Sequence, residues 1–104
     1  MSEQFVRVAK VSEILPGRAL VVVLGDRELA VCNVSGSFYA IDNICTHDGG
    51  PLDQGELQGR IMECPRHGAQ FDVTTGEAVE LPAMIPLDTF QVRVNGEDIE
   101  VEVP

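Results

Sequence analysis

Two short cysteine–histidine motifs constrain the fold of this chain more than any other feature. A C-x-H motif at Cys45 and His47 is followed, after sixteen residues, by a C-x-x-H motif at Cys64 and His67. The chain contains only two histidines and three cysteines, so chance is a poor explanation for this pairing. Glycines flank both motifs, as expected where the backbone adopts positive φ or lies close to a bound group. The fold must therefore bring two loops together around one site.

The donor set of these motifs points to a metal. Two thiolates and two imidazoles can bind zinc tetrahedrally, although zinc sites usually group cysteine with cysteine and histidine with histidine. Here each loop supplies one of each, which favours a binuclear site such as a [2Fe–2S] centre with two histidines on one iron. The spacing favours iron–sulfur and leaves zinc open. A Cys45–His47 nucleophile–base pair is a weaker hypothesis, because it leaves Cys64 and His67 unexplained.

Composition excludes several classes of partner. The 104 residues suffice for one domain, with 7 basic and 17 acidic side chains and a formal net charge of -10. An acidic body repels phosphates, which argues against nucleic-acid binding. The longest apolar run, 19–24, is far shorter than the roughly twenty residues of a membrane helix. An odd cysteine count and the lack of a signal-like N-terminus argue against a secreted disulfide framework. We expect a cytoplasmic protein without membrane contact.

Short, valine-rich segments between glycines and prolines indicate an all-β chain. Helical periodicity is weak, and many short strands with frequent turns are typical of an antiparallel sandwich or barrel. The predicted strands are 5–11, 19–24, 28–34, 37–41, 60–64, 70–73, 90–94 and 98–103.

Two hairpins are predicted in detail. Asn95-Gly96 as a two-residue loop sets Val92 opposite Ile99 and Arg93 opposite Asp98.

In the second hairpin, a turn at Ser35-Gly36 sets Cys32 opposite Tyr39. Both faces of this hairpin are apolar, so we expect it to be central and Cys32 to be a small core residue.

The segments 45–49 and 64–68, Cys-Thr-His-Asp-Gly and Cys-Pro-Arg-His-Gly, resemble the motif pair of the Rieske proteins. Weaker collinear matches extend the resemblance over nearly the whole chain: Gly36–Asp42, Pro51-Leu52, Gly55, Phe71-Asp72 and Thr75-Gly76. The resemblance implies the Rieske fold, an antiparallel β-sandwich or barrel base with a small inserted cluster-binding subdomain. The base would comprise residues 1–41 and 73–104, and the subdomain residues 42–72.

The resemblance also implies the cofactor and its ligands. Cys45 and Cys64 would hold one iron of a single Rieske-type [2Fe–2S] cluster, and His47 and His67 would hold the other. No residue is expected to be catalytic.

Four positions depart from the respiratory and photosynthetic Rieske proteins. Those proteins carry an additional, disulfide-forming cysteine in each loop, where this chain has Gly50 and Arg66. They also place hydroxyls near the cluster sulfurs, where this chain has Ala69 and Phe71. The chain is more similar to the soluble ferredoxins that serve bacterial aromatic-ring dioxygenases.

The expected function is therefore one-electron transfer from an NAD(P)H-dependent reductase to a terminal oxygenase in aromatic hydrocarbon catabolism. Docking to both partners is expected to be transient and electrostatic. The alternative is a fixed electron-relay subunit of a larger enzyme, such as the small subunit of a nitrite reductase; a zinc module ranks third. Segment 81–87 is either a cover for the cluster or a linker.

Overall fold

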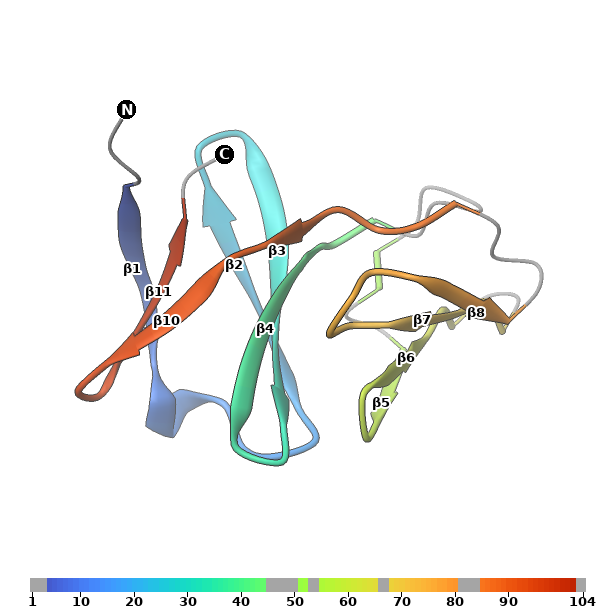
Figure 1. Cartoon of the computed structure of the whole chain (residues 1–104), viewed down its shortest axis with the longest axis horizontal. Coiled ribbons are helices and arrows are strands. Elements are labelled where there is room, and N and C mark those ends of the chain that lie inside the picture. Colours follow the sequence, from blue (N-terminus) through green and yellow to red (C-terminus); the bar gives the residue numbers. More distant parts are fainter. Residues whose placement is uncertain (1–3, 45–50, 53–54, 66–67, 81–84, 103–104) are drawn as a thin grey trace.

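The computed structural model describes residues 4–44, 51–52, 55–65, 68–80 and 85–102. Within these residues the chain forms eleven strands and one short 3-10 helix (Figure 1). No helix in this part of the chain is long and apolar enough to cross a membrane. The elements in chain order are β1 (Phe5–Lys10), η1 (Val11–Glu13), β2 (Ala19–Leu24), β3 (Arg27–Val34), β4 (Ser37–Asp42), β5 (Glu56–Gln58), β6 (Ile61–Glu63), β7 (Gln70–Asp72), β8 (Ala78–Glu80), β9 (Thr89–Phe90), β10 (Val92–Asn95) and β11 (Asp98–Glu102).

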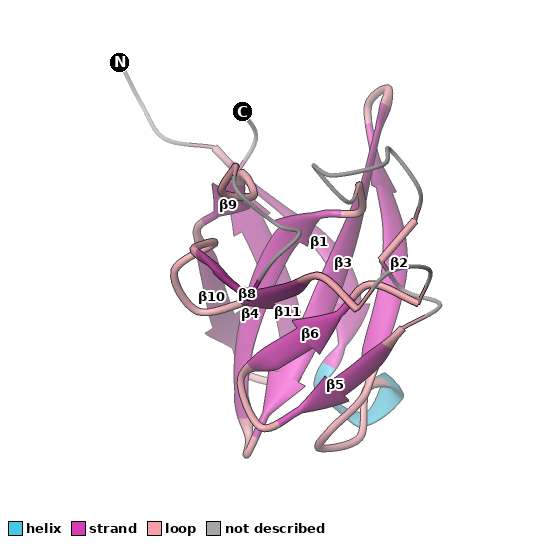
Figure 2. Ribbon diagram, turned by 90° about the vertical axis from the view of Figure 1, so that its right-hand side faces the viewer, coloured by secondary structure: helices cyan, strands magenta, loops and turns pink. Residues whose placement is uncertain are grey.

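The strands form three antiparallel sheets, ordered β1-β11-β10, β2-β3-β4-β9 and β5-β6-β7-β8. The second sheet lies between the other two, as the two perpendicular views show (Figures 1 and 2). The predicted antiparallel, all-β class is confirmed. Strands β5 and β8 were not predicted, because each is a three-residue edge strand without a β-branched run.

Strand β3 is buried on both of its faces. Leu29 and Val31 point into a core shared with the β1-β11-β10 sheet, and Ala30 and Cys32 point into a core shared with the β5–β8 sheet. All four side chains have 0% exposure. Successive residues of a strand point to opposite faces, so a continuous apolar run is what a doubly covered strand requires.

The predicted hairpin at Ser35-Gly36 is confirmed. Ser35 and Gly36 have φ values of 51° and 94°, and Cys32 lies opposite Tyr39. Positive φ at both central residues is the signature of a type I′ turn.

The C-terminal hairpin is present, but its predicted register is wrong by two residues. The loop consists of Gly96 and Glu97, and Asn95 pairs with Asp98. Gly96 has a φ of 64° while Glu97 has no positive φ, which matches a type II′ turn with glycine at its first central position.

The corrected register changes the partners without exchanging the faces of the strand. Val94 lies opposite Ile99, and Arg93 donates from Nε to Glu100 at 2.6 Å instead of meeting Asp98. A shift of two residues preserves the inward and outward alternation, so hydrophobic patterning alone does not distinguish the two registers.

The predicted strand 90–94 is divided between two sheets. Phe90 of β9 pairs with Ala40 of β4, whereas β10 begins at Val92 and pairs with β11. Between them, the carbonyl of Gln91 accepts a hydrogen bond from the Glu102 amide at 2.9 Å. The chain thus crosses from the middle sheet to the outer sheet at Gln91.

Burial of β3 leads to a stability prediction. Leu29→Ala should lower the free energy of unfolding by about 2–5 kcal/mol, because it removes fully buried methyl groups and leaves a cavity. Val23→Ala, on the same hairpin but 68% exposed, should cost less than about 1 kcal/mol. Anaerobic denaturant unfolding measures both values. Equal losses in the two variants would contradict the assigned core.

Candidate metal centre

Cys64 lies directly after β6, at the base of the β6–β7 hairpin. Its amide donates to the Ala69 carbonyl at 2.7 Å, and its carbonyl accepts from the Gly68 amide at 3.2 Å. Gly68 has a φ of 74°, a conformation that side chains disfavour. Backbone hydrogen bonds therefore close the loop that carries the second motif.

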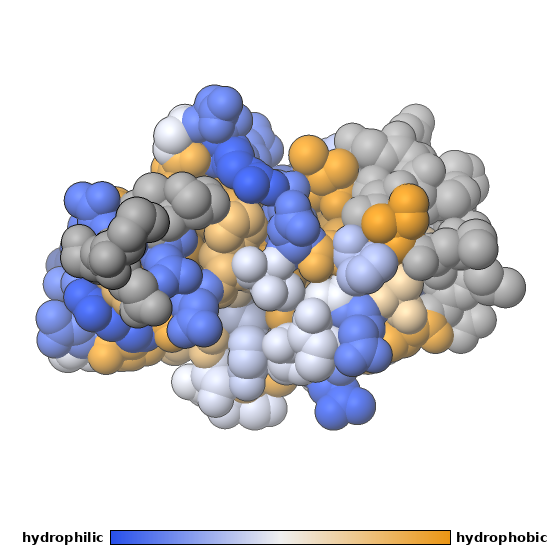
Figure 3. Space-filling view, turned by 45° about the horizontal axis from the view of Figure 1, so that its top comes forward, coloured by the Kyte–Doolittle hydropathy of each residue, from blue (hydrophilic) through white to orange (hydrophobic). Residues whose placement is uncertain are grey.

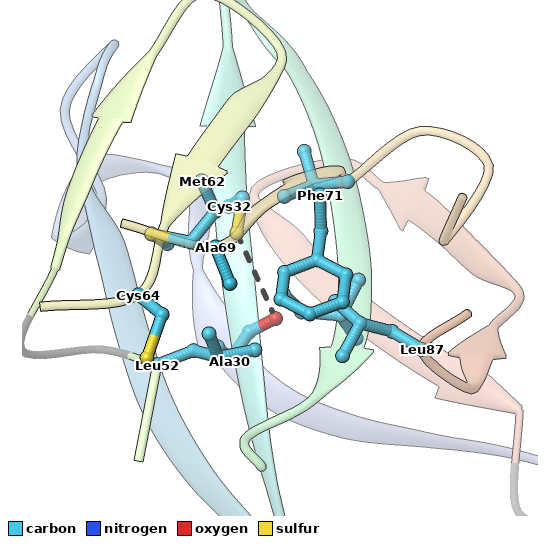
Figure 4. Close-up of a cluster of buried hydrophobic side chains, with 10 residues drawn as sticks. Ala30, Cys32, Leu52, Met62, Cys64, Ala69, Phe71 and Leu87 are labelled. Atoms are coloured by element: carbon cyan, nitrogen blue, oxygen red, sulfur yellow. Dashed lines mark hydrogen bonds between the residues drawn. The ribbon is translucent and has the colours of Figure 1, made fainter. Parts of the chain in front are cut away.

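The side chain of Cys64 is 1% exposed and belongs to an apolar cluster (Figure 4). Its neighbours in this cluster include Leu52, Met62, Ala69 and Phe71, each no more than 1% exposed. Ala69 and Phe71 supply no hydroxyl, as the sequence shows. The predicted cysteine ligand thus sits beside an apolar core that excludes water and offers no hydroxyl from these two positions.

The other three predicted ligands, Cys45, His47 and His67, lie outside the described residues, as does Arg66. Segment 81–84 of the proposed cover also lies outside them. Within the described part of the chain, no group of three or more potential metal-ligating side chains occurs. The structure therefore places one of the four predicted ligands and leaves the set itself a prediction.

Gly55 brings the segment between the motifs against the second motif. Its amide donates to the Leu52 carbonyl at 2.9 Å. A Cβ added at Gly55 would overlap the backbone oxygen of Glu63, the residue before Cys64. Here glycine is required for close backbone approach and not for a positive φ.

Two ion pairs that the sequence does not reveal join Arg27, at the start of β3, to Asp42 at the end of β4 and to Asp88 directly before β9. Arg27 Nη2 lies 3.0 Å from the Asp42 carboxylate and 3.2 Å from the Asp88 carboxylate. Its guanidinium carbon lies 5.1 Å from the centroid of the Phe90 ring. Hydrogen bonds to Asp42 and then to Asp88 raise the pKa of Arg27. No sequence motif marks Arg27, because strand pairing alone brings these groups together.

Cys32 has the structural role that the sequence predicts. It is fully buried, and burial raises the pKa of its thiol to about 12. Its thiol lies 3.9 Å from the carbonyl oxygen of Ala30, a weak contact within β3. A protonated, inaccessible thiol is neither a nucleophile nor a metal ligand.

The donor chemistry fits an iron–sulfur cluster. The two motifs supply two cysteines and two histidines, and thiolate and imidazole are the ligands of Rieske-type centres. The buried position of Cys64 is consistent with a cluster attached to the protein core.

Comparison with known proteins identifies the family. The sequence matches the Rieske [2Fe-2S] domain over residues 4–91. It is 36% identical to the ferredoxin component of the naphthalene 1,2-dioxygenase system of Pseudomonas aeruginosa, over 99% of both chains. It is 37% identical to the ferredoxin component of biphenyl 2,3-dioxygenase of Rhodococcus jostii, over 93% of this chain and 91% of the relative. The chain belongs to the Rieske [2Fe–2S] domain family.

Solved structures agree with this assignment. The ferredoxin of Sphingomonas yanoikuyae B1 superimposes with a TM-score of 0.92 at 34% identity, over 97% of this chain and 100% of that one. A complex of reduced oxygenase and oxidized ferredoxin from carbazole 1,9a-dioxygenase matches with a TM-score of 0.89 at 36% identity, over 94% of this chain and 92% of that one. A protein described as the small subunit of an NADH-dependent nitrite reductase from Mycobacterium tuberculosis has a TM-score of 0.85 at 20% identity, over 98% of this chain and 96% of that one, and shares the fold alone.

Family membership confirms the Rieske fold and one Rieske-type [2Fe–2S] cluster as the cofactor. The full-length relatives are ferredoxins, so the chain is an electron carrier and not a catalytic enzyme.

The contact at Gly55 leads to a prediction about cluster retention. Gly55→Ala should displace the segment between the motifs, lower the melting temperature and reduce the iron bound per chain, because backbone occupies the space for a methyl group. Gly25→Ala separates lost stability from lost cluster: at a φ of 67° it strains the β2–β3 turn, but its Cβ meets no atom within 4 Å, so it should lower the melting temperature and retain its iron. Iron analysis and thermal melting measure both variants. Iron retention in Gly55→Ala equal to that in Gly25→Ala would show that the contact is unimportant.

Proposed function

We propose that this chain is the ferredoxin component of an aromatic-ring dioxygenase system. It accepts one electron from an NAD(P)H-dependent reductase and delivers it to a terminal oxygenase. The observation that carries the proposal is full-length similarity to ferredoxin components of naphthalene and biphenyl dioxygenases, with both metal-binding motifs intact. The relatives serve different aromatic compounds, so the similarity supports the class of substrate and not one compound.

Four side chains are proposed to hold the cluster. Cys45 and Cys64 bind one iron as thiolates, and His47 and His67 bind the other as neutral imidazoles. When bound, the cluster supplies reversible one-electron transfer. Support comes from the motif pair and from the position of Cys64 against the apolar core. Water exclusion by Met62 and Phe71 protects the bound group and lowers the local polarity.

The organisation of the chain is part of the same proposal. We assign residues 42–72 to the cluster-binding subdomain and residues 1–41 and 73–104 to the base. Strand β8 follows this boundary in the sequence but pairs with β7, so the sheet that carries the second motif extends beyond residue 72. The similarity to ferredoxin components supports a soluble protein, and we propose that it acts in the cytoplasm.

A fixed relay subunit remains the second candidate. The nitrite reductase small subunit supports only a shared fold at 20% identity. Ferredoxin components of 36–37% identity favour the diffusing carrier.

Metal analysis tests the assigned cofactor and one ligand. The purified protein should contain about two irons and two acid-labile sulfides per chain, with negligible zinc. After dithionite reduction its EPR spectrum should have an average g value below that of the free electron. Cys64→Ala should abolish the cluster, whereas Cys32→Ala, which alters a buried cysteine outside the two motifs, should retain it. Stoichiometric zinc in protein from an iron-replete host would contradict the assignment.

Charge leads to a prediction about docking. The net charge of -10 should attract a basic partner surface, and on the face shown in Figure 3 hydrophilic side chains are interspersed with apolar ones. The rate constant for reduction of the oxygenase should fall at least about tenfold between about 0.02 and 0.5 M salt, because salt screens the attraction. Stopped-flow kinetics measures this rate. A rate independent of salt would favour the fixed subunit.

A pair of charge-neutralising variants localises the docking surface. Glu63→Gln, beside Cys64, should slow the reaction at low salt. Glu97→Gln, in the β10–β11 loop at the opposite end of the molecule, should have little effect (Figure 1). Equal effects would indicate that only the overall charge matters.

A further inference from the structure

A side-chain hydrogen bond joins the two ends of the segment that carries the first motif. Asn43 follows β4 directly and is 3% exposed. Its Oδ1 accepts a hydrogen bond from the Leu52 amide at 3.0 Å, nine positions further along the chain. Cys45 and His47 lie between these two residues in the sequence. This bond, the Asn43–Leu52 clasp, therefore closes the base of the first motif's loop.

The clasp closes the base of the first loop, just as the pairing of two strands closes the base of the second. The second motif follows β6, and pairing of β6 with β7 closes its loop through backbone groups. The first motif follows β4, whereas the next strand, β5, pairs with β6 and not with β4. The two strands that flank the first loop, β4 and β5, do not pair with each other. The Leu52 amide donates instead to the side-chain oxygen of Asn43.

Both partners in the clasp are themselves fixed. The Asn43 amide donates to the Glu28 carbonyl on β3 at 3.0 Å, and Asn43 Nδ2 lies 3.5 Å from the Glu28 carboxylate. The Leu52 side chain is 0% exposed and packs in the same apolar cluster as Cys64. The clasp thus connects the doubly buried strand of the base to the core beneath the metal centre.

The same connection continues to the second motif. The Leu52 carbonyl accepts from Gly55, and Gly55 packs against the backbone oxygen of Glu63. Glu63 immediately precedes Cys64. A short series of backbone contacts therefore leads from the clasp to the ligand in the second loop.

We propose that Asn43 is a positioning residue for the cluster, an inference that rests on the proposed function. The hydrogen bond from the Leu52 amide to Asn43 fixes the base of the first loop relative to Cys64. It thereby fixes the distance between the ligands of the first motif and those of the second. A metal centre requires its ligands in one arrangement, and groups hydrogen-bonded behind those ligands maintain it. Without the clasp, the Leu52 amide loses its acceptor and the connection from β3 to Cys64 is weakened, so the metal should be released more readily.

The test compares two buried asparagines with similar local roles. Asn33 is 4% exposed; its Oδ1 accepts from the Gly36 amide at 2.8 Å and its Nδ2 donates to the Ile14 carbonyl at 2.7 Å. It lies in the β3–β4 hairpin of the base. Asn43→Ala and Asn33→Ala each remove a buried acceptor for a backbone amide, and only Asn43→Ala opens the clasp.

Cluster loss is followed by bleaching of the visible absorption in the presence of an iron chelator, below the melting temperature of both variants. Asn43→Ala should lose its cluster at least tenfold faster than wild type, with a shifted reduction potential or altered g values. Asn33→Ala should remain within twofold of wild type in rate, with an unchanged potential and EPR spectrum. Equal rates and unchanged spectra in the two folded variants overturn the proposal.

A second comparison applies if Asn43→Ala does not fold. Asn43→Asp retains an acceptor for the Leu52 amide, and a Glu28→Gln background removes the repulsion between neighbouring carboxylates. The double variant should lose its cluster at a rate within threefold of that of Glu28→Gln alone, and a rate tenfold higher overturns the proposal.

The outcomes for the inference and for the proposed function differ. Wild-type protein without iron and sulfide overturns the proposed function. A wild-type cluster, with equal rates of cluster loss from the two asparagine variants, overturns only this inference.

Discussion

Burial of β3 on both faces is the packing constraint on which the rest of the described structure depends. Alternate side chains of this strand complete two cores, one with the β1-β11-β10 sheet and one with the β5–β8 sheet. The second core contains Cys64, which belongs to the second motif, and Leu52, whose amide donates to the Asn43 side chain. Because close-packed cores deform little, the position of the β5–β8 sheet follows from the packing of β3. The metal centre is therefore tied to the most deeply buried strand of the protein.

The surroundings of Cys64 also bear on the reduction potential. Donors to cluster sulfurs stabilise the reduced state, because reduction adds negative charge. Ala69 and Phe71 are both fully buried in the Cys64 core and carry no hydroxyl. Potentials of Rieske centres range from about −150 to +300 mV, and the lack of these two donors favours the low end. A low potential suits a carrier that precedes an oxygen-activating iron enzyme.

The sequence predicts the elements that depend on local chemistry. The Ser35-Gly36 turn and the central position of its hairpin follow from turn residues and from apolar residues on both faces, and the structure confirms both. The C-terminal register does not follow, because glycine satisfies a type I′ or a type II′ turn and a shift of two residues keeps the same faces. Long-range contacts carry no local signal: Arg27 reaches Asp42 and Asp88 only after β3, β4 and β9 have paired. The ligand motif is predictable because thiolates and imidazoles at this spacing have few alternative roles. The Asn43–Leu52 hydrogen bond is not predictable, because it joins residues nine positions apart and has no sequence motif.

The excess of acidic residues is better explained by partner attraction than by folding. Among the described residues, Arg7, Arg27, Arg60 and Arg93 form ion pairs with carboxylates. Such pairs at the surface contribute little to stability, typically less than about 1 kcal/mol each. A net charge of -10 on 104 residues opposes the compact state through self-repulsion. A carrier that must find one partner, leave it and find another gains association rate from long-range attraction, and weak contacts allow rapid release. The acidic surface thus lowers the stability of the folded state and raises the rate of electron delivery.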